Sequence, residues 1–134
     1  RIVNLAKKSG IEVIAIPGPS ALSASLSICG LPTDHFFFEG FLPKKKGRKT
    51  RFKFLLNLDV SIIIYESPIR ILKTLNDLSN YMGSNRVVSL CREMTKKFEE
   101  VFIGDLDSAI DYFGNKKIKG EFVIVLAKNG YSIE

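Results

Sequence analysis

The sequence predicts an α/β domain with a mixed parallel and antiparallel sheet of about five strands and flanking helices. Two observations predict it. Short runs of β-branched and aromatic residues alternate along the chain with stretches in which apolar residues recur every three or four positions, as on an amphipathic helix. Hydrophobic residues make up 46% of the 134 residues, which is enough to build a core. The longest apolar segments fall well short of the roughly 20 residues that cross a bilayer, so no membrane contact is expected.

The first sixteen residues resemble the end of a preceding α/β unit. A helix is predicted over 1–8, closed by Ser9 and Gly10, and a strand over 11–16. We therefore expect three parts: residues 1–16 as the last helix and strand of a truncated N-terminal domain, 17–127 as a C-terminal domain, and 128–134 as a polar tail.

Prolines interrupt the chain directly after this segment. Pro17 and Pro19 prevent a continuing ladder, and Ser20 is placed to cap a helix over 21–29 that ends at Gly30. A turn of this kind leaves backbone N–H groups pointing outward, where an anion or a cofactor carboxylate can bind.

An aromatic strand, predicted over 36–42, precedes the most basic part of the chain. Glu39 lies within this strand and must either face solvent or be paired in a site, because an unpaired buried carboxylate is costly. Six cations follow without an acidic residue between them: Lys44, Lys45, Lys46, Arg48, Lys49 and Arg51. The run is either a solvated loop or an arm that contacts phosphates, and the net charge of +6 favours a polyanionic partner. A helix is predicted over 50–57.

The run of three isoleucines at 62–64 predicts a strand buried on both faces. Tyr65 and Glu66 end this strand, and ligands of open α/β sheets bind at the carboxyl ends of strands. Ser67 as cap and Pro68 at the first helical position predict a helix to Met82. The alternative to a ligand site at this strand end is a purely structural one, in which a strand and a capped helix carry solvated charges.

The remaining elements are three strands and one helix. Strands are predicted over 86–91, 98–103 and 120–126, and a helix over 106–113 after a turn at 104–105. Polar clusters at 65–66, 92–93 and 120–121 mark strand ends, and an active site would require them to converge on one pocket.

Cys29 and Cys91 lie far apart in apolar stretches, and His35 is the single histidine. We therefore expect free thiols in a reducing, cytoplasmic setting, and no metal site.

Six motifs in order carry a resemblance to a known family. They are Pro17-Gly18-Pro19-Ser20-Ala21-Leu22, Gly30-Leu31-Pro32-Thr33-Asp34, Phe38-Glu39-Gly40-Phe41-Leu42-Pro43 with its basic run, Tyr65-Glu66-Ser67-Pro68-Ile69-Arg70, Cys91-Arg92-Glu93-Met94-Thr95-Lys96 and Gly120-Glu121-Phe122-Val123. Over about residues 11–127 the chain resembles the ribosomal RNA small-subunit methyltransferase I family of the tetrapyrrole-methylase-like class. Ile69 departs from the histidine that this family has in its YESPHR form.

The resemblance implies a function and an architecture. It implies transfer of a methyl group from S-adenosyl-L-methionine to the ribose 2′-oxygen of a cytidine in 16S ribosomal RNA, within the small ribosomal subunit. It also implies a homodimer of two-domain chains, with the cofactor between the domains and this chain as the C-terminal domain of the class III methyltransferase fold. The cofactor positions that match are Ser20, Ala21, Tyr65, Glu66, Glu93, Met94, Gly120, Glu121 and Phe122. The six cations of residues 44–51 become RNA-binding candidates.

A ribose hydroxyl needs a base or a nearby cation before it attacks a methyl group. Glu39, Arg70 and Lys96 are the catalytic candidates, beside Glu66 and Glu93, and structural ion pairs explain each of them equally well. Two alternatives stay open: a methyltransferase acting on a tetrapyrrole such as a uroporphyrinogen or precorrin, and a non-catalytic RNA-binding domain.

Overall fold

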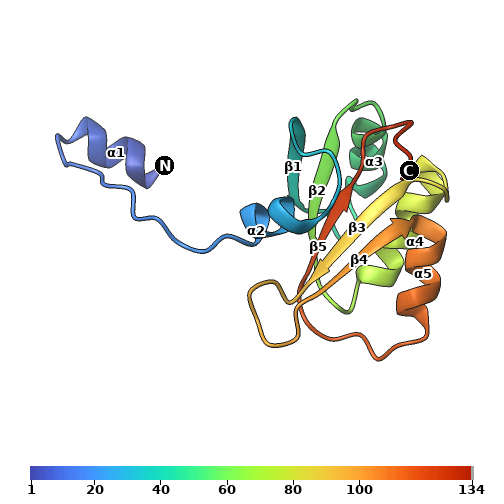
Figure 1. Ribbon diagram of the computed structural model, residues 1–134. Helices are drawn as coiled ribbons and strands as arrows, with labels where there is room; N and C mark the ends of the chain where they lie inside the picture. Colours follow the sequence, from blue (N-terminus) through green and yellow to red (C-terminus); the bar gives the residue numbers. More distant parts are fainter. Residues whose placement is uncertain (134) are drawn as a thin grey trace.

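The computed structural model describes residues 1–133 and forms one mixed sheet with helices on both faces (Figure 1). The strands are β1 (Phe36–Phe41), β2 (Ser61–Glu66), β3 (Val87–Arg92), β4 (Glu100–Asp105) and β5 (Phe122–Leu126). The helices are α1 (Ile2–Lys8), α2 (Ala21–Ile28), α3 (Arg48–Leu56), α4 (Ile71–Met82) and α5 (Leu106–Gly114). The strand order is β1-β2-β5-β3-β4, in which β1 and β2 are parallel and the other neighbours antiparallel. The predicted fold class is confirmed.

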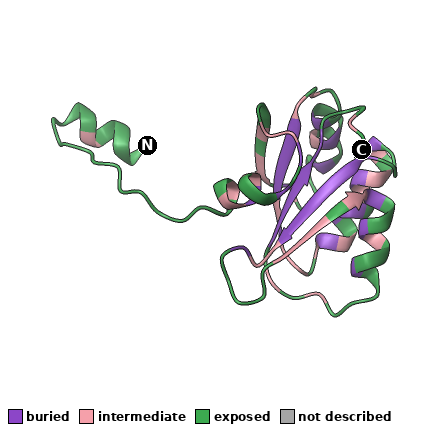
Figure 2. Cartoon of the chain, viewed as in Figure 1, coloured by how far each residue is buried: buried purple, intermediate pink, exposed green. Residues whose placement is uncertain are grey.

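The three central strands are buried on both faces (Figure 2). Ile62 and Ile64 of β2 point into a core shared with α3, α4 and α5, whereas Ile63 points into a second core on the face that α2 covers. Because alternate side chains of a strand face opposite sides of a sheet, an unbroken apolar run suits a strand covered twice.

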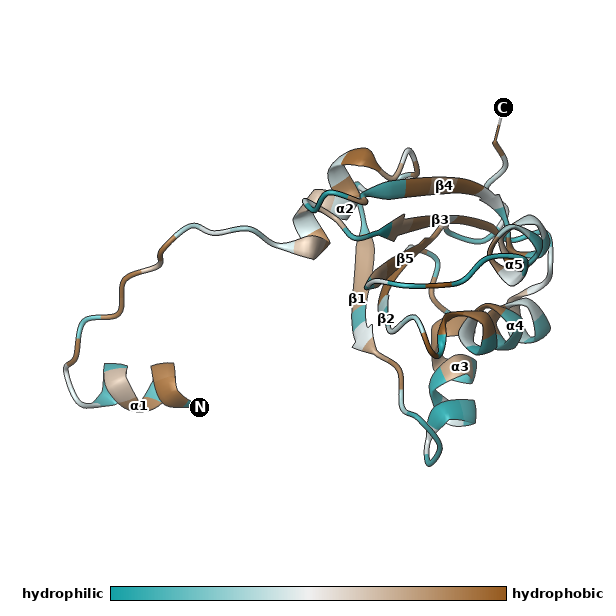
Figure 3. Ribbon diagram, turned by 90° about the horizontal axis from the view of Figure 1, so that it is seen from below, coloured by the Kyte–Doolittle hydropathy of each residue, from teal (hydrophilic) through white to brown (hydrophobic). Residues whose placement is uncertain are grey.

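Helix α1 and the segment after it extend away from the sheet (Figure 1). The strand predicted over 11–16 is wrong: within residues 1–133 this segment pairs with no strand, and Ile11, Ile14 and Ile16 are exposed. β-branched residues favour an extended backbone. A strand also needs backbone hydrogen bonds to a neighbouring strand, and the local sequence does not show whether such a neighbour is present. Figure 3 shows hydrophobic stretches along this extended segment.

Several element boundaries differ from prediction by one to four residues. Helix α3 starts at Arg48 instead of Thr50, and α4 starts at Ile71 because residues 67–70 form a turn in which the Ser67 carbonyl accepts from the Arg70 and Ile71 N–H groups. Strand β4 runs over 100–105, so the predicted turn at 104–105 belongs to the strand. Asp105 then caps α5 by accepting a hydrogen bond of 2.8 Å from the Ser108 N–H.

Of the predicted tail 128–134, residue 134 lies outside the described residues. Residues 1–133 contain no helix that is both long and apolar enough to span a membrane.

Candidate active site

A cavity of about 470 Å³ opens where β2 ends and β5 begins. Glu66 and Phe122 face each other across these antiparallel strands, which places two of the predicted polar clusters at one sheet edge. The lining residues are Ala21, Phe41, Tyr65, Glu66, Ser67, Pro68, Glu121, Phe122 and Val123. Five of the nine predicted cofactor positions therefore lie on one cavity, contributed by α2, β2 and the start of β5.

Aromatic rings form one wall of this cavity. The ring centroid of Tyr65 lies 5.1 Å from that of Phe38 and 5.7 Å from that of Phe41, both edge to face. A bulge in β1 between Phe38 and Gly40 places the two phenylalanines on the same face. Sequence reasoning missed Phe41 as a lining residue; its place at the end of a strand beside a bulge-forming glycine was the available signal.

The Glu66 carboxylate is fully buried and held from several sides. It accepts hydrogen bonds from the Ser67 N–H at 2.8 Å and the Thr74 hydroxyl at 2.7 Å, and Arg70 pairs with it at 2.8 Å. A carboxylate with all of these partners fixes the end of β2. Arg70 is tied to the same carboxylate and does not line the cavity.

The second and third polar clusters also meet. The Glu93 side chain accepts a 2.9 Å hydrogen bond from the Glu121 N–H, and Lys96 lies 3.0 Å from both the Glu93 and Glu121 carboxylates. The backbone hydrogen bond from Glu121, and then Lys96, hold the pKa of Glu93 below its ordinary value. Glu121, followed by Glu93, raises the pKa of Lys96. Both groups are therefore charged at neutral pH, and Lys96 is a cation rather than a base.

Gly120 is required for this arrangement. Its φ of 88° lies in the left-handed region, and a Cβ atom there would overlap the Glu93 side chain. The polar clusters at 92–93 and 120–121, which an active site would require to converge, are in contact here.

Two further cofactor candidates lie elsewhere. Met94 is buried in the core beneath α2, and Ser20 precedes α2 with an exposed side chain that makes no capping hydrogen bond in the described structure. Ser20 occupies the N-cap position of α2 as predicted, and its carbonyl accepts a 2.9 Å hydrogen bond from the Ala24 N–H, but its side chain does not cap the helix.

Glu39 does not line the cavity. Its side chain is 5% exposed and accepts bidentate hydrogen bonds from Arg51 of α3. The ion pair joins β1 to α3. Glu39 is therefore paired rather than solvent-facing, but its partner is Arg51 and the pair lies outside the cavity.

The predicted RNA-binding residues divide into two groups. Lys44, Lys45, Lys46 and Lys49 are exposed around the start of α3, which Figure 3 shows as a hydrophilic projection. Arg51 is paired with Glu39, and Arg48 is buried against α4 and paired with Asp77. Both guanidinium groups already have a carboxylate partner and are therefore not placed to bind a phosphate.

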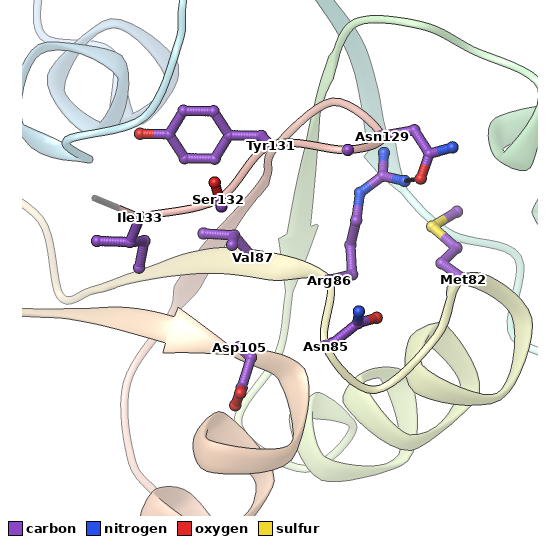
Figure 4. A pocket seen from close by; sticks show the side chains of 10 residues that line it. Met82, Asn85, Arg86, Val87, Asp105, Asn129, Tyr131, Ser132 and Ile133 are labelled. Atoms are coloured by element: carbon purple, nitrogen blue, oxygen red, sulfur yellow. Dashed lines mark hydrogen bonds between the residues drawn. The ribbon is translucent and has the colours of Figure 1, made fainter.

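A second cavity of about 470 Å³ lies near the opposite ends of the central strands, around Arg86 (Figure 4). Arg86 donates to the Ala127 carbonyl at 2.6 Å and to the Asn129 side chain at 3.0 Å. None of the predicted site residues lines this cavity.

Among residues 1–133, no group of three or more His, Cys, Asp and Glu side chains could hold a metal ion. Cys29 and Cys91 are free and buried, and burial raises the pKa of the Cys91 thiol.

Comparison with known proteins identifies the family of this chain. Residues 1–110 match the family model for tetrapyrrole (corrin/porphyrin) methylases, and the chain belongs to that family. Among solved structures, the methyltransferase CobJ shares its fold with a TM-score of 0.67 at 17% identity, over 99% of this chain and 58% of that one. A uroporphyrin-III C-methyl transferase from Thermus thermophilus, complexed with S-adenyl homocysteine, gives a TM-score of 0.58 at 17% identity, over 93% and 57% of the two chains.

More similar relatives are named ribosomal RNA small subunit methyltransferase I. The chain is 43% identical to the one from Thermotoga maritima over 120 residues, which are 90% of this chain and 54% of that protein. It is 43% identical to the one from Synechocystis over 127 residues, 94% of this chain and 46% of that protein. The chain thus spans about half the length of the curated relatives that it matches.

Proposed function

We propose that this chain is half of an S-adenosyl-L-methionine-dependent methyltransferase that methylates the ribose 2′-oxygen of a cytidine in 16S ribosomal RNA. The observation that carries the proposal is the convergence of Ala21, Tyr65, Glu66, Glu121 and Phe122 on one cavity. Relatives that share 43% of its residues are named for ribosomal RNA. Because they are about twice as long, we assign the activity to a chain of that length, with residues 17–127 as its C-terminal domain.

The cavity suits part of such a cofactor. Its lining is largely apolar, with backbone groups at two strand ends and the Tyr65 ring beside them, as small-molecule sites usually are. Residues 21, 65–67 and 121–123 would hold the nucleoside portion. When bound, the cofactor supplies a sulfonium methyl group, which is already a good electrophile.

The chemical work left to the protein is mainly positioning. Lys96, charged and half-exposed above Glu93 and Glu121, is the cation that we assign to the edge of the site. Arg70 orients Glu66, and Glu39 has a structural role. This half of the enzyme then supplies no general base, and we expect one in the other domain.

RNA contact is assigned to Lys44, Lys45, Lys46 and Lys49. They are exposed and close together in sequence, and phosphate neutralisation by such residues dominates affinity for nucleic acid. We further propose a cytoplasmic homodimer, on the family resemblance.

Methyl transfer from labelled S-adenosylmethionine to 16S ribosomal RNA, to small ribosomal subunits and to uroporphyrinogen tests the proposal. We expect the full-length protein to label the RNA or the subunit, at a ribose, and residues 1–134 alone to show no turnover. Label on uroporphyrinogen alone would establish the tetrapyrrole alternative. RNA binding without any methyl transfer by the full-length protein would establish the non-catalytic one.

A further inference from the structure

A buried row of hydrogen bonds connects the cavity to the basic segment 44–49. At the cavity end, the Thr74 hydroxyl of α4 donates to the Glu66 carboxylate at 2.7 Å. The same oxygen accepts from Nη2 of Arg48 at 2.9 Å. The directions are fixed, because a guanidinium only donates and a carboxylate only accepts. Thr74 is fully buried, so no water competes for either bond.

Arg48 has two more partners at the other end of the row. Its Nε atom donates to Asp77 at 2.8 Å, and its Nη1 atom donates to the Pro43 carbonyl at 3.1 Å. Pro43 directly precedes Lys44. Arg48 is one of the six cations of residues 44–51, and its side chain joins the start of this basic segment to α4.

The charges along the row balance. Glu66 and Asp77 are negative, whereas Arg70 and Arg48 are positive, and each pair is 2.8 Å apart. Buried charges persist when they are paired and fully hydrogen-bonded, and losing one partner leaves the others unsatisfied. Loss of the Thr74 hydroxyl would leave one Glu66 oxygen and one Arg48 nitrogen without a partner. The disturbance would fall on residues 66–68, which form a wall of the cavity.

We propose that Arg48 and Thr74 are positioning residues for the cofactor cavity, acting through Glu66, and that Arg48 does not contact RNA. The proposal rests on the proposed function, because it names the cavity as the cofactor site. Lys49 is the matched comparison: it follows Arg48 in α3 and is exposed.

The test uses the full-length protein and two readouts: the affinity for S-adenosylhomocysteine by calorimetry, and the salt dependence of binding to a 16S ribosomal RNA fragment. Arg48→Gln should weaken S-adenosylhomocysteine binding by about 5- to 30-fold and leave the salt slope of RNA binding unchanged. Lys49→Gln removes the same charge one residue away and should do the reverse, lowering the salt slope by about one.

A second pair of variants guards against loss of folding in Arg48→Gln. Thr74→Val removes the hydroxyl at nearly constant shape and should also weaken S-adenosylhomocysteine binding by about 5- to 30-fold, whereas Thr74→Ser should bind within about 3-fold of wild type. Thermal unfolding of each variant shows which of them are folded.

Two results would overturn the proposal and leave the proposed function standing. One is wild-type S-adenosylhomocysteine affinity in Thr74→Val; the other is a reduced salt slope with unchanged S-adenosylhomocysteine affinity in Arg48→Gln. Absence of S-adenosylhomocysteine binding to the wild-type protein would overturn both.

Discussion

At the scale of single residues, the segment that leads into β5 is held by a side chain far away in sequence. Gly120 is tolerable only as glycine, because Glu93 occupies the space of its missing Cβ atom and its φ is 88°. Glu93 itself has a φ of 51°, which non-glycine residues seldom adopt. The strain at Glu93 is offset by its hydrogen bond from the Glu121 N–H, so the two positions stabilise one another.

Gly120→Ala should lower the free energy of unfolding by about 1 to 3 kcal/mol, since it combines a positive φ with an overlap on Glu93. Urea denaturation of residues 1–134 measures the change. Gly114→Ala is the control, because a Cβ there meets nothing within 4 Å and φ is not positive; there we expect no loss of stability. Equal effects of the two substitutions would contradict both the strain at this φ and the overlap with Glu93.

At the scale of elements, local sequence predicted which segments form helices and strands, and tertiary contacts decided where each one ends. The isoleucine run and the 3.6-residue periodicity of α4 are enough to predict β2 and α4, because both patterns reflect burial directly. Strand β4 begins at Glu100 because Glu100 pairs with Arg92 of β3. The alternating pattern of the predicted strand over 98–103 does not show with which residues of β3 it pairs. The segment 11–16 has a strand-like composition but no pairing partner in the described structure.

The same limit applies to the site. Motif order pointed to the residues that line the cavity, yet the burial of Glu39 and Arg48 followed from partners in α3 and α4 that spacing does not reveal. Thr74 was missed altogether. A threonine on the apolar face of α4, between Ile71 and Leu78, was its available signal, since a buried hydroxyl requires a hydrogen-bond partner.

Glu100 joins β3, β4 and α5, and it makes stability depend on pH. It accepts hydrogen bonds from Tyr112 at 2.6 Å and Arg92 at 2.7 Å. The Tyr112 hydroxyl, followed by Arg92 and Lys116, lowers the pKa of Glu100 in the folded state. Its stabilisation is therefore present above the ordinary carboxyl pKa and is lost as the pH falls through the lowered value.

Glu100→Gln should destabilise the protein by about 1 kcal/mol at neutral pH, and the difference from wild type should shrink to nothing in acid. Urea unfolding between about pH 7 and about pH 2 checks this. Asp111→Asn is the control, because the exposed Asp111 carboxylate has no hydrogen bond or ion pair within residues 1–133. A pH-independent difference for Glu100→Gln would mean that charge has no part in the effect.

At the scale of the whole molecule, the doubly buried strands end at the cavity, and the four exposed lysines of residues 44–49 lie in the projection at the start of α3. This division would separate the two tasks of the function that we propose, which are holding a small cofactor and holding a large polyanion. Rigid strand ends present backbone groups at fixed positions, whereas exposed lysines can adjust to a folded RNA surface. The buried hydrogen bonds from Glu66 through Thr74 to Arg48 connect the cavity to the segment that carries the exposed lysines.

The central claim is that the cavity at the end of β2 binds the cofactor. Calorimetric titration of S-adenosylhomocysteine into the full-length protein and its Ala21→Trp variant tests this most directly, because Ala21 lines the cavity and an indole would fill it. The control is Ser23→Trp, an exposed position on the same helix that does not line the cavity. We predict that Ala21→Trp abolishes binding and that Ser23→Trp binds as wild type does. Undiminished binding by the folded Ala21→Trp protein would contradict the account and place the cofactor elsewhere.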